Sequence, residues 1–185
     1  MVLELFHPTV ARWFKERFGA PSPPQLEAWP AIRRGEDVLV AAPTGSGKTL
    51  AAFMAAIDGL VRDGLNGSLG DELRVLYISP LKALSVDIAE NLERPIQGIF
   101  ERIAEERLPA FDLRVAVRTG DTPANERTKL LKKHPHLFVT TPESLFILLT
   151  SEGGRRLLKS VETVIVDEIH SLARDKRGTH LTLSL

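Results

Sequence analysis

Short, uninterrupted apolar runs alternate with longer stretches of mixed character along this chain. A short apolar run without alternation is typical of a strand that is covered on both faces, as in a parallel sheet. The runs predict strands over Asp37–Ala42, Arg74–Ser79, Leu113–Arg118, Leu137–Thr140 and Val161–Asp167.

The longer stretches between these runs predict helices over Lys48–Asp63, Ala83–Arg107, Ala124–Lys133 and Glu143–Leu149. Strands separated by helices form βαβ units, so we expect an α/β fold of three layers around a mostly parallel sheet. Ligands of such sheets bind beyond the carboxyl ends of the strands. Residues with functional chemistry are therefore expected directly after a strand.

Composition and charge narrow the class of protein. The 185 residues include 24 Lys and Arg and 24 Asp and Glu, so the formal net charge is zero and no broadly basic surface is indicated. The lack of cysteine excludes disulfides and thiolate metal sites, and it permits the cytoplasmic location that we expect. The longest apolar stretch, Leu50–Ile57, is far shorter than the roughly 20 residues that span a bilayer. We expect no membrane partner and see no secretory signal.

The sharpest motif is the glycine-rich segment from Ala42 to Thr49, which lies between a predicted strand and a predicted helix. In that context, backbone N–H groups and the start of the helix surround phosphate oxygens. The side chain of Lys48 is expected to reach the β- and γ-phosphates of ATP, and the Thr49 hydroxyl to bind Mg²⁺. The remaining candidate phosphate-binding residues are Pro43, Thr44, Gly45, Ser46 and Gly47.

A second motif, Asp167-Glu168-Ile169-His170, ends the last predicted strand. Asp167 is the candidate to hold Mg²⁺ through its hydration shell, and Glu168 to orient or deprotonate a water molecule. Acidic residues also end many strands without such a role. Next to a bound triphosphate, however, they would repel it unless a metal ion bridged the charges, so the two motifs support each other.

The pair PTGSGKT and DEIH resembles the first motor domain of superfamily 2 helicases. Further segments resemble the large helicase-related (Lhr) family over essentially the whole chain: RFGAPSPPQLEAWP, YISPLKALSVD, VRTGDTP, TTPESLFILL and VDEIHSLARDKRGTHLTLSL. This resemblance implies an ATP-driven translocase on single-stranded nucleic acid, DNA more than RNA, that unwinds duplexes in DNA repair. It also implies that residues 1–185 are one RecA-like ATP-binding domain, in which residues 1–24 form an N-terminal extension with the start of the glutamine motif.

The resemblance also assigns roles to single residues around the nucleotide. Gln25 corresponds to the glutamine that reads the edge of adenine, although a lone glutamine on a helix is more often a surface residue. His170 corresponds to the residue that couples the nucleotide state to movement between domains, or else it is a hydrogen-bonding neighbour. Trp29 we interpret as a core residue rather than a stacking platform.

The resemblance places contacts to the nucleic-acid backbone at Lys82, Thr119, Gly120 and Thr141. Lys82 is nearly as well explained as a helix-surface lysine. Thr141 has a local explanation as the N-cap of a helix that begins at Pro142, and a helix start can also attract phosphate. Such contacts follow phosphates and sugars and do not read bases.

In the family that the chain resembles, the next motif is a Ser-Ala-Thr strand, followed by a second RecA-like domain with an arginine finger. Both would lie after Leu185, so we expect these residues alone to bind ATP weakly and hydrolyse it very slowly. Two other functions stay open: an ATP-switched module that binds nucleic acid without unwinding it, and a small-molecule kinase. The acidic pair and the lack of a recognisable lid for an acceptor argue against the kinase.

Overall fold

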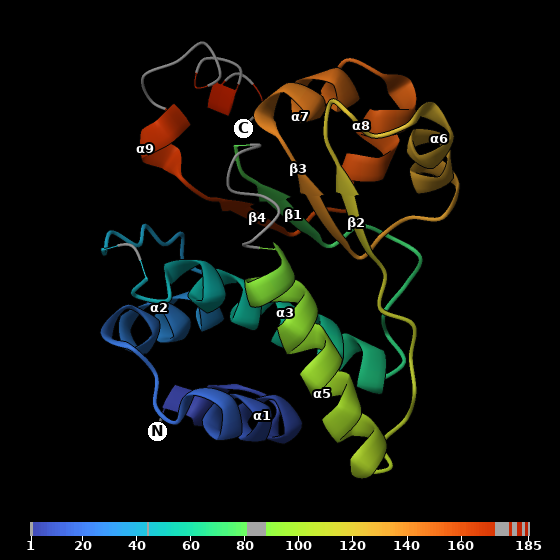
Figure 1. Cartoon of the computed structure of the whole chain (residues 1–185). Coiled ribbons are helices and arrows are strands. Elements are labelled where there is room, and N and C mark those ends of the chain that lie inside the picture. Colours follow the sequence, from blue (N-terminus) through green and yellow to red (C-terminus); the bar gives the residue numbers. More distant parts are fainter. Residues whose placement is uncertain are drawn as a thin grey trace. The chain divides into compact units, whose positions relative to one another are not determined.

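The computed structural model describes residues 2–43, 45–80, 88–172, 178, 181, 182 and 184. They fall into two compact units, one made of residues 1–68 and 86–111 and the other of residues 69–85 and 112–185. Figure 1 gives the order of the elements along the chain. Within the described ranges, no helix combines the length and apolar character needed to cross a bilayer.

The described part of the first unit is helical. Its elements are η1 (Val2–Leu5), α1 (Pro8–Phe18), α2 (Pro23–Arg33), α3 (Lys48–Leu65), the π-helical turn η2 (Ala89–Glu93) and α5 (Arg94–Glu105). Aromatic rings form much of its core: Trp29 is fully buried and packs edge-on against Phe6 and Phe14. The Trp29 indole donates a hydrogen bond of 2.9 Å to the carbonyl oxygen of Ala51. The interpretation of Trp29 as a core residue is confirmed.

A buried carboxylate joins three elements of this unit. Asp58 on α3 is fully buried, forms ion pairs with Arg33 of α2 and Arg62 of its own helix, and accepts a hydrogen bond of 2.6 Å from the backbone N–H of His7. Burial, and then the Arg62 charge, lower the pKa of His7. The Glu106 charge opposes this shift and raises the pKa.

We expect Asp58→Asn to lower the free energy of unfolding by about 2–3 kcal/mol, because both arginines lose their carboxylate partner. The effect is smaller than for a fully buried pair, since the Arg62 side chain is 40% exposed. Denaturant unfolding followed by tryptophan fluorescence measures it. Asp37→Asn, at an exposed position of the same unit, is the control; equal stability of the two variants would contradict the prediction.

The strand predicted over Asp37–Ala42 is wrong. The segment has no regular secondary structure, and Val38 and Leu39 are 37% and 81% exposed. Within the described residues, none of its backbone groups takes part in a sheet ladder. A strand forms only when a neighbour supplies hydrogen-bond partners, so an apolar run alone does not make one.

The second unit contains a parallel sheet of four strands, β1 (Val75–Ile78), β2 (Val115–Arg118), β3 (Leu137–Thr140) and β4 (Thr163–Val166). Their order across the sheet is β2-β3-β1-β4, as Figure 1 shows. In register, Ile78 lies opposite Thr140 and Val166, and Thr140 opposite Arg118. The predicted parallel α/β fold and four of the five predicted strands are confirmed, with small differences at the strand ends.

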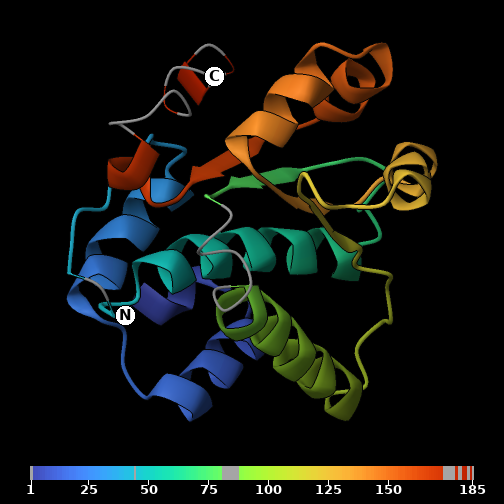
Figure 2. The ribbon, with the colours of Figure 1, turned by 45° about the horizontal axis from the view of Figure 1, so that its top comes forward.

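The core of this unit lies between the sheet and the helices α7 (Pro142–Leu149) and α8 (Glu152–Leu158). Buried side chains of the sheet and of the two helices form it, together with Leu73 before β1 and Leu181 near the end of the chain: Leu73, Leu76, Ile78, Phe138, Leu145, Leu148, Leu157 and Leu181. In Figures 1 and 2, α7 and α8 lie on the same side of the sheet. The remaining helices of the unit's described part are α6 (Ala124–Lys132) and α9 (Ile169–Leu172).

The predicted helices agree with the structure to within a few residues wherever they are described. The predicted helix Ala83–Arg107 is seen as η2 and α5, and residues 83–87 lie outside the described residues. Helix α8 was not predicted, because its glycines weaken the helical pattern. Close packing requires glycine at position 154, because a Cβ atom of Gly154 would lie 2.1 Å from the carbonyl oxygen of Leu148.

Candidate functional site

The glycine-rich segment forms a tight turn that leads into α3. Gly45 and Gly47 have φ angles of +79° and +85°, and Gly47 is the N-cap of α3. At Gly47 the left-handed backbone disfavours a side chain, and a Cβ atom would lie 2.8 Å from Nε2 of Gln25, which would have to move. The backbone N–H of Ser46 donates to the carbonyl oxygen of Pro43 at 3.2 Å. Thr44 lies outside the described residues.

Lys48 is the first residue of α3, and its side chain folds back into the turn. The ammonium group donates to the carbonyl oxygens of Ala42 and Pro43, at 2.5 and 2.8 Å. Thr49 follows on the same first turn of the helix. The structure thus brings the ammonium group and the loop backbone together, and the predicted contact of Lys48 with the phosphates of ATP stays a prediction.

The hydroxyl oxygen of Ser46 is buried and has no hydrogen-bond partner in the described part of the chain. A buried polar atom without a partner is uncommon and costs free energy. It lies in a turn that also holds two left-handed glycines, an ammonium group and the start of an 18-residue helix. These are the groups that a phosphate requires, so the residues present fit a nucleotide phosphate.

Gln25 is 3% exposed and lies in the first turn of α2, not on the surface. Its amide oxygen accepts from the backbone N–H of Ser22 at 2.9 Å, and its amide nitrogen donates to the carbonyl oxygen of Gly47 at 3.3 Å. The surface alternative is therefore excluded. Gln25 links the start of α2 to the glycine-rich turn, and its predicted contact with adenine stays a prediction.

Asp167 follows β4 directly and is held in three ways. Its backbone N–H donates to the carbonyl oxygen of Ile78 at 2.9 Å, which extends the β1–β4 ladder by one bond. Its Oδ2 accepts from the hydroxyl of Tyr77 at 2.8 Å, and its Oδ1 from the backbone N–H of Glu168 at 2.7 Å. Oxygen donors of this kind suit Mg²⁺, so the residue fits its predicted role.

Glu168 has a left-handed backbone with a φ angle of +52°, which is uncommon for a residue with a side chain. The N–H and hydroxyl of Ser171 both bond to its carbonyl oxygen, at 2.9 and 2.8 Å, and stabilise this conformation. The Glu168 carboxylate lies 3.1 Å from the His170 ring, whose side chain is 81% exposed. Strained backbone of this kind is frequent at functional sites.

The predicted nucleic-acid contacts follow β2 and β3, which are neighbours in the sheet. Thr119 and Gly120 begin a turn after β2, in which the Thr119 hydroxyl accepts from the N–H of Asp121 at 3.3 Å. Thr141 is the N-cap of α7 and accepts from the N–H of Ser144 at 3.3 Å, so its predicted capping role is confirmed. Lys82 lies outside the described residues.

Arg118, the last residue of β2, was not predicted as a site residue. It is only 7% exposed, and its buried Nε atom has no hydrogen-bond partner among the described residues. Burial first, and then the nearby charge of Arg127, lower its pKa. Arg127 itself donates to the carbonyl oxygens of Gly120 and Thr122. An arginine at the end of an apolar strand run was the available signal, because it needs an anion when buried.

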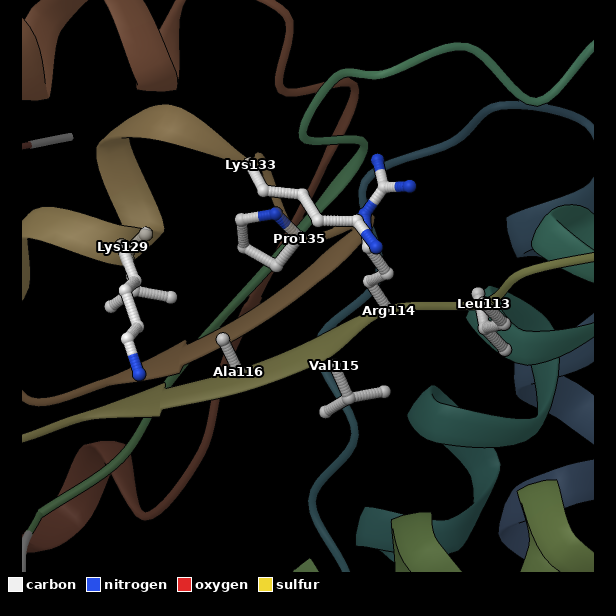
Figure 3. A pocket seen from close by; sticks show the side chains of 8 residues that line it. Leu113, Arg114, Val115, Ala116, Lys129, Lys133 and Pro135 are labelled. Atoms are coloured by element: carbon white, nitrogen blue, oxygen red, sulfur yellow. The ribbon is translucent and has the colours of Figure 1, made fainter. Parts of the chain in front are cut away.

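An open groove beside β2 and α6 is lined by eight residues: Leu113, Arg114, Val115, Ala116, Lys129, Leu130, Lys133 and Pro135 (Figure 3). None of the predicted site residues lines it. The Arg114 side chain is already bonded to Asp71, Asp112 and the carbonyl oxygen of His134. The groove therefore contributes nothing to the site described above.

Comparison with known proteins gives consistent matches. A family model for DEAD/DEAH box helicases matches residues 22–185. The chain is 50% identical over 184 residues to ATP-dependent helicase Lhr-Core protein 2 of Thermococcus barophilus, covering 100% of this chain and 21% of the relative. It is 52% identical over 181 residues to the Lhr helicase/probable uracil glycosylase of Mycolicibacterium smegmatis, covering 97% of this chain and 12% of the relative.

Solved helicase structures match the chain as well. The helicase Lhr of Mycobacterium smegmatis bound to ssDNA and AMP-PNP superposes with a TM-score of 0.88 at 49% identity, covering 99% of this chain and 23% of that one. The yeast DEAD-box splicing factor Prp28 has a TM-score of 0.75 at 22% identity, covering 98% and 42%, which shows the shared fold alone. The chain spans about a fifth or less of the length of the two Lhr relatives that it matches in sequence.

Proposed function

Because this chain belongs to the DEAD/DEAH box helicase family, in its large helicase-related branch, we propose that it forms one ATP-binding domain of a nucleic-acid motor. In the full polypeptide, it works with a second RecA-like domain to move along single-stranded nucleic acid and unwind duplexes. DNA is the favoured substrate, since the Lhr helicase of Mycobacterium smegmatis was solved with ssDNA. We place this activity in DNA repair.

The phosphate-binding turn is the observation that carries the proposal. The ammonium group of Lys48 is held by two carbonyl oxygens of the turn, and the Ser46 hydroxyl lacks a partner among the described residues. The phosphates of ATP offer acceptors to both groups and form stronger, charge-assisted bonds with the ammonium group than neutral carbonyls do. The bound AMP-PNP of the Lhr structure from Mycobacterium smegmatis supports this choice of ligand.

Hydrolysis is assigned to the acidic pair of the second unit together with Thr49. Mg²⁺, when bound, neutralises charge on the β- and γ-phosphates. Thr49 and Asp167 would hold it, Asp167 through metal-bound water molecules. Glu168 accepts a proton from, or orients, the attacking water. His170, whose ring lies 3.1 Å from the Glu168 carboxylate, couples the nucleotide state to movement between domains in this proposal.

The proposal is tested by the ATP hydrolysis rate of the full polypeptide with single-stranded DNA, single-stranded RNA or neither. We expect hydrolysis to depend on nucleic acid, and DNA to stimulate it more than RNA. Residues 1–185 alone are expected to hydrolyse ATP very slowly, because an arginine supplied by a partner domain contributes about 10³–10⁵ in related phosphoryl transfer. A rate unaffected by either nucleic acid would contradict the motor function.

Unwinding separates this function from the alternative of an ATP-switched module that binds nucleic acid without unwinding it. The motor predicts ATP-dependent strand separation by the full polypeptide, measured with a labelled duplex that carries a single-stranded tail. Tight, ATP-dependent binding without strand separation would favour the alternative.

Substitution of Arg118 tests the predicted contacts between the turn after β2 and the nucleic-acid backbone. A guanidinium group whose buried Nε atom lacks a partner among the described residues gains an acceptor when a phosphate binds at the adjacent turn. We expect Arg118→Ala to weaken binding of single-stranded DNA about tenfold and to reduce the slope of log affinity against log salt by about 1, with ATP binding unchanged. Fluorescence anisotropy at several salt concentrations measures both.

Arg156→Ala is the matched control for Arg118→Ala. Arg156 belongs to the same unit, and its side chain is 74% exposed beside Glu152. We expect this variant to leave affinity and salt slope unchanged. If Arg118→Ala behaves in the same way, Arg118 does not contact the nucleic acid.

A further inference from the structure

We propose that Tyr77 is a positioning residue, whose hydroxyl group fixes the carboxylate of Asp167 for Mg²⁺-dependent nucleotide binding. This rests on the proposed function, in which Asp167 holds Mg²⁺ through water. Tyr77 is the single tyrosine of the chain and is completely buried. A buried phenol requires an acceptor, and here the acceptor is a predicted functional group.

The sheet register explains how Tyr77 reaches this carboxylate. In the β1–β4 pair, Tyr77 lies opposite Ile165. Asp167 follows two residues later and therefore faces the same side of the sheet as Ile165. The long phenol side chain spans this diagonal step and places its hydroxyl 2.8 Å from Oδ2. A shorter polar side chain at position 77 would not reach the carboxylate.

Both carboxylate oxygens of Asp167 thus accept a hydrogen bond, one from Tyr77 and one from the N–H of Glu168. Two donors on different oxygens fix the plane of the group about its side-chain torsion. A carboxylate oxygen has two lone pairs, so one hydrogen bond to each oxygen is compatible with a metal-bound water molecule at the same group. The carboxylate is therefore oriented before a metal ion arrives, so its rotational freedom is not lost at that moment.

The chemistry of the donor matters as much as its position. The Tyr77 hydroxyl is neutral, so it orients the carboxylate without cancelling its negative charge. A lysine or arginine at the same place would compete with Mg²⁺ for that charge. Phenylalanine retains the ring and its packing but removes the donor, which makes Tyr77→Phe the informative substitution.

The experiment compares the full polypeptide with its Tyr77→Phe variant. Fluorescence of an N-methylanthraniloyl-labelled AMP-PNP reports nucleotide binding while Mg²⁺ is titrated. We expect the Mg²⁺ concentration at half-maximal binding to rise about five- to tenfold in Tyr77→Phe, as for the loss of one hydrogen bond to a charged group. Nucleotide binding in EDTA is expected to be unchanged.

Two further variants separate positioning from general stability. Phe138→Leu changes another fully buried aromatic residue of the sheet and is expected to lower the melting temperature without moving the Mg²⁺ midpoint. In an Asp167→Asn background, Tyr77→Phe should cause no additional shift of the midpoint. An equal shift in that background would show that Tyr77 does not act through Asp167.

The outcomes also distinguish this inference from the proposed function. If wild-type binding depends on Mg²⁺ and Tyr77→Phe has the same midpoint, the role of Tyr77 is refuted and the function stands. If the wild-type polypeptide shows no Mg²⁺-dependent nucleotide binding, the proposed function fails, and the role of Tyr77 fails with it.

Discussion

Lys48→Ala is expected to weaken ATP binding about 100-fold and to abolish detectable hydrolysis. The ammonium group is the one side-chain cation that the structure places in the described part of the phosphate-binding turn. Charge-assisted hydrogen bonds to a triphosphate contribute about 1.5–3 kcal/mol each, and the loss of one or two of them accounts for an effect of this size. Equilibrium binding of a fluorescent ATP analogue measures the affinity.

The same substitution should leave the fold intact. Lys48 occupies the first position of α3, where alanine is well tolerated, and its ammonium group bonds to two loop carbonyl groups that remain near solvent. Lys15→Ala, on an exposed position of α1 in the same unit, is the control and is expected to bind ATP normally. Equal ATP affinity of both variants would remove the basis for assigning this turn to phosphate.

Local features of the sequence predicted much of the fold. Four apolar runs became β1 to β4, because a short run without polar alternation is typical of a strand in a parallel sheet. All four residues of β1 and of β3 are buried, whereas Val117 of β2 and Val164 of β4 are 39% and 46% exposed. The capping of α7 was also predictable, since Thr141 followed by Pro142 forms a helix start through contacts within one turn. The ends of these elements depend on their neighbours and were less accurately predicted.

The error at Asp37–Ala42 has a different origin. The composition of this run matches that of the true strands, but strand formation requires hydrogen bonds to another segment, and no pattern within the run contains that information. The opposite error occurred at α8, where two adjacent glycines conceal a helix. Gly154 is required there by close packing against the backbone of Leu148, a contact that no helical periodicity reveals.

In the candidate site, too, the features built by neighbouring residues could be predicted, and those built by distant residues could not. The glycine turn, Lys48 and the acidic pair could be recognised because neighbouring residues build each motif. The partners that orient them come from elsewhere in the chain: Gln25 is bonded to Gly47, and Tyr77 to Asp167. Tyr77 and Asp167 are 90 positions apart, and only the register of β1 against β4 brings them together.

Glu168→Gln is expected to separate nucleotide binding from hydrolysis. The amide has nearly the shape of the carboxylate, but it is not a base and cannot accept the proton of the attacking water. We expect the rate of ATP hydrolysis by the full polypeptide to fall about 10²–10⁴-fold, the usual contribution of a positioned general base. ATP affinity should change less than about threefold, because Lys48 and the loop supply most of the binding. Duplex unwinding should be lost together with hydrolysis.

The substitution Glu168→Gln is expected to change the chemistry of the side chain without changing the backbone. Glutamine and glutamate have the same branching at Cβ, so the left-handed φ of +52° and the two bonds from Ser171 impose the same strain on both. Glu152→Gln, on the surface of α8 in the same unit, is the control and should retain full activity. Since the introduced amide would still accept a hydrogen bond but not a proton, hydrolysis within a few-fold of the wild-type rate would show that a different group activates the water. In that case Glu168 would only orient the water, and its strained backbone would serve the geometry of the site and not its proton transfer.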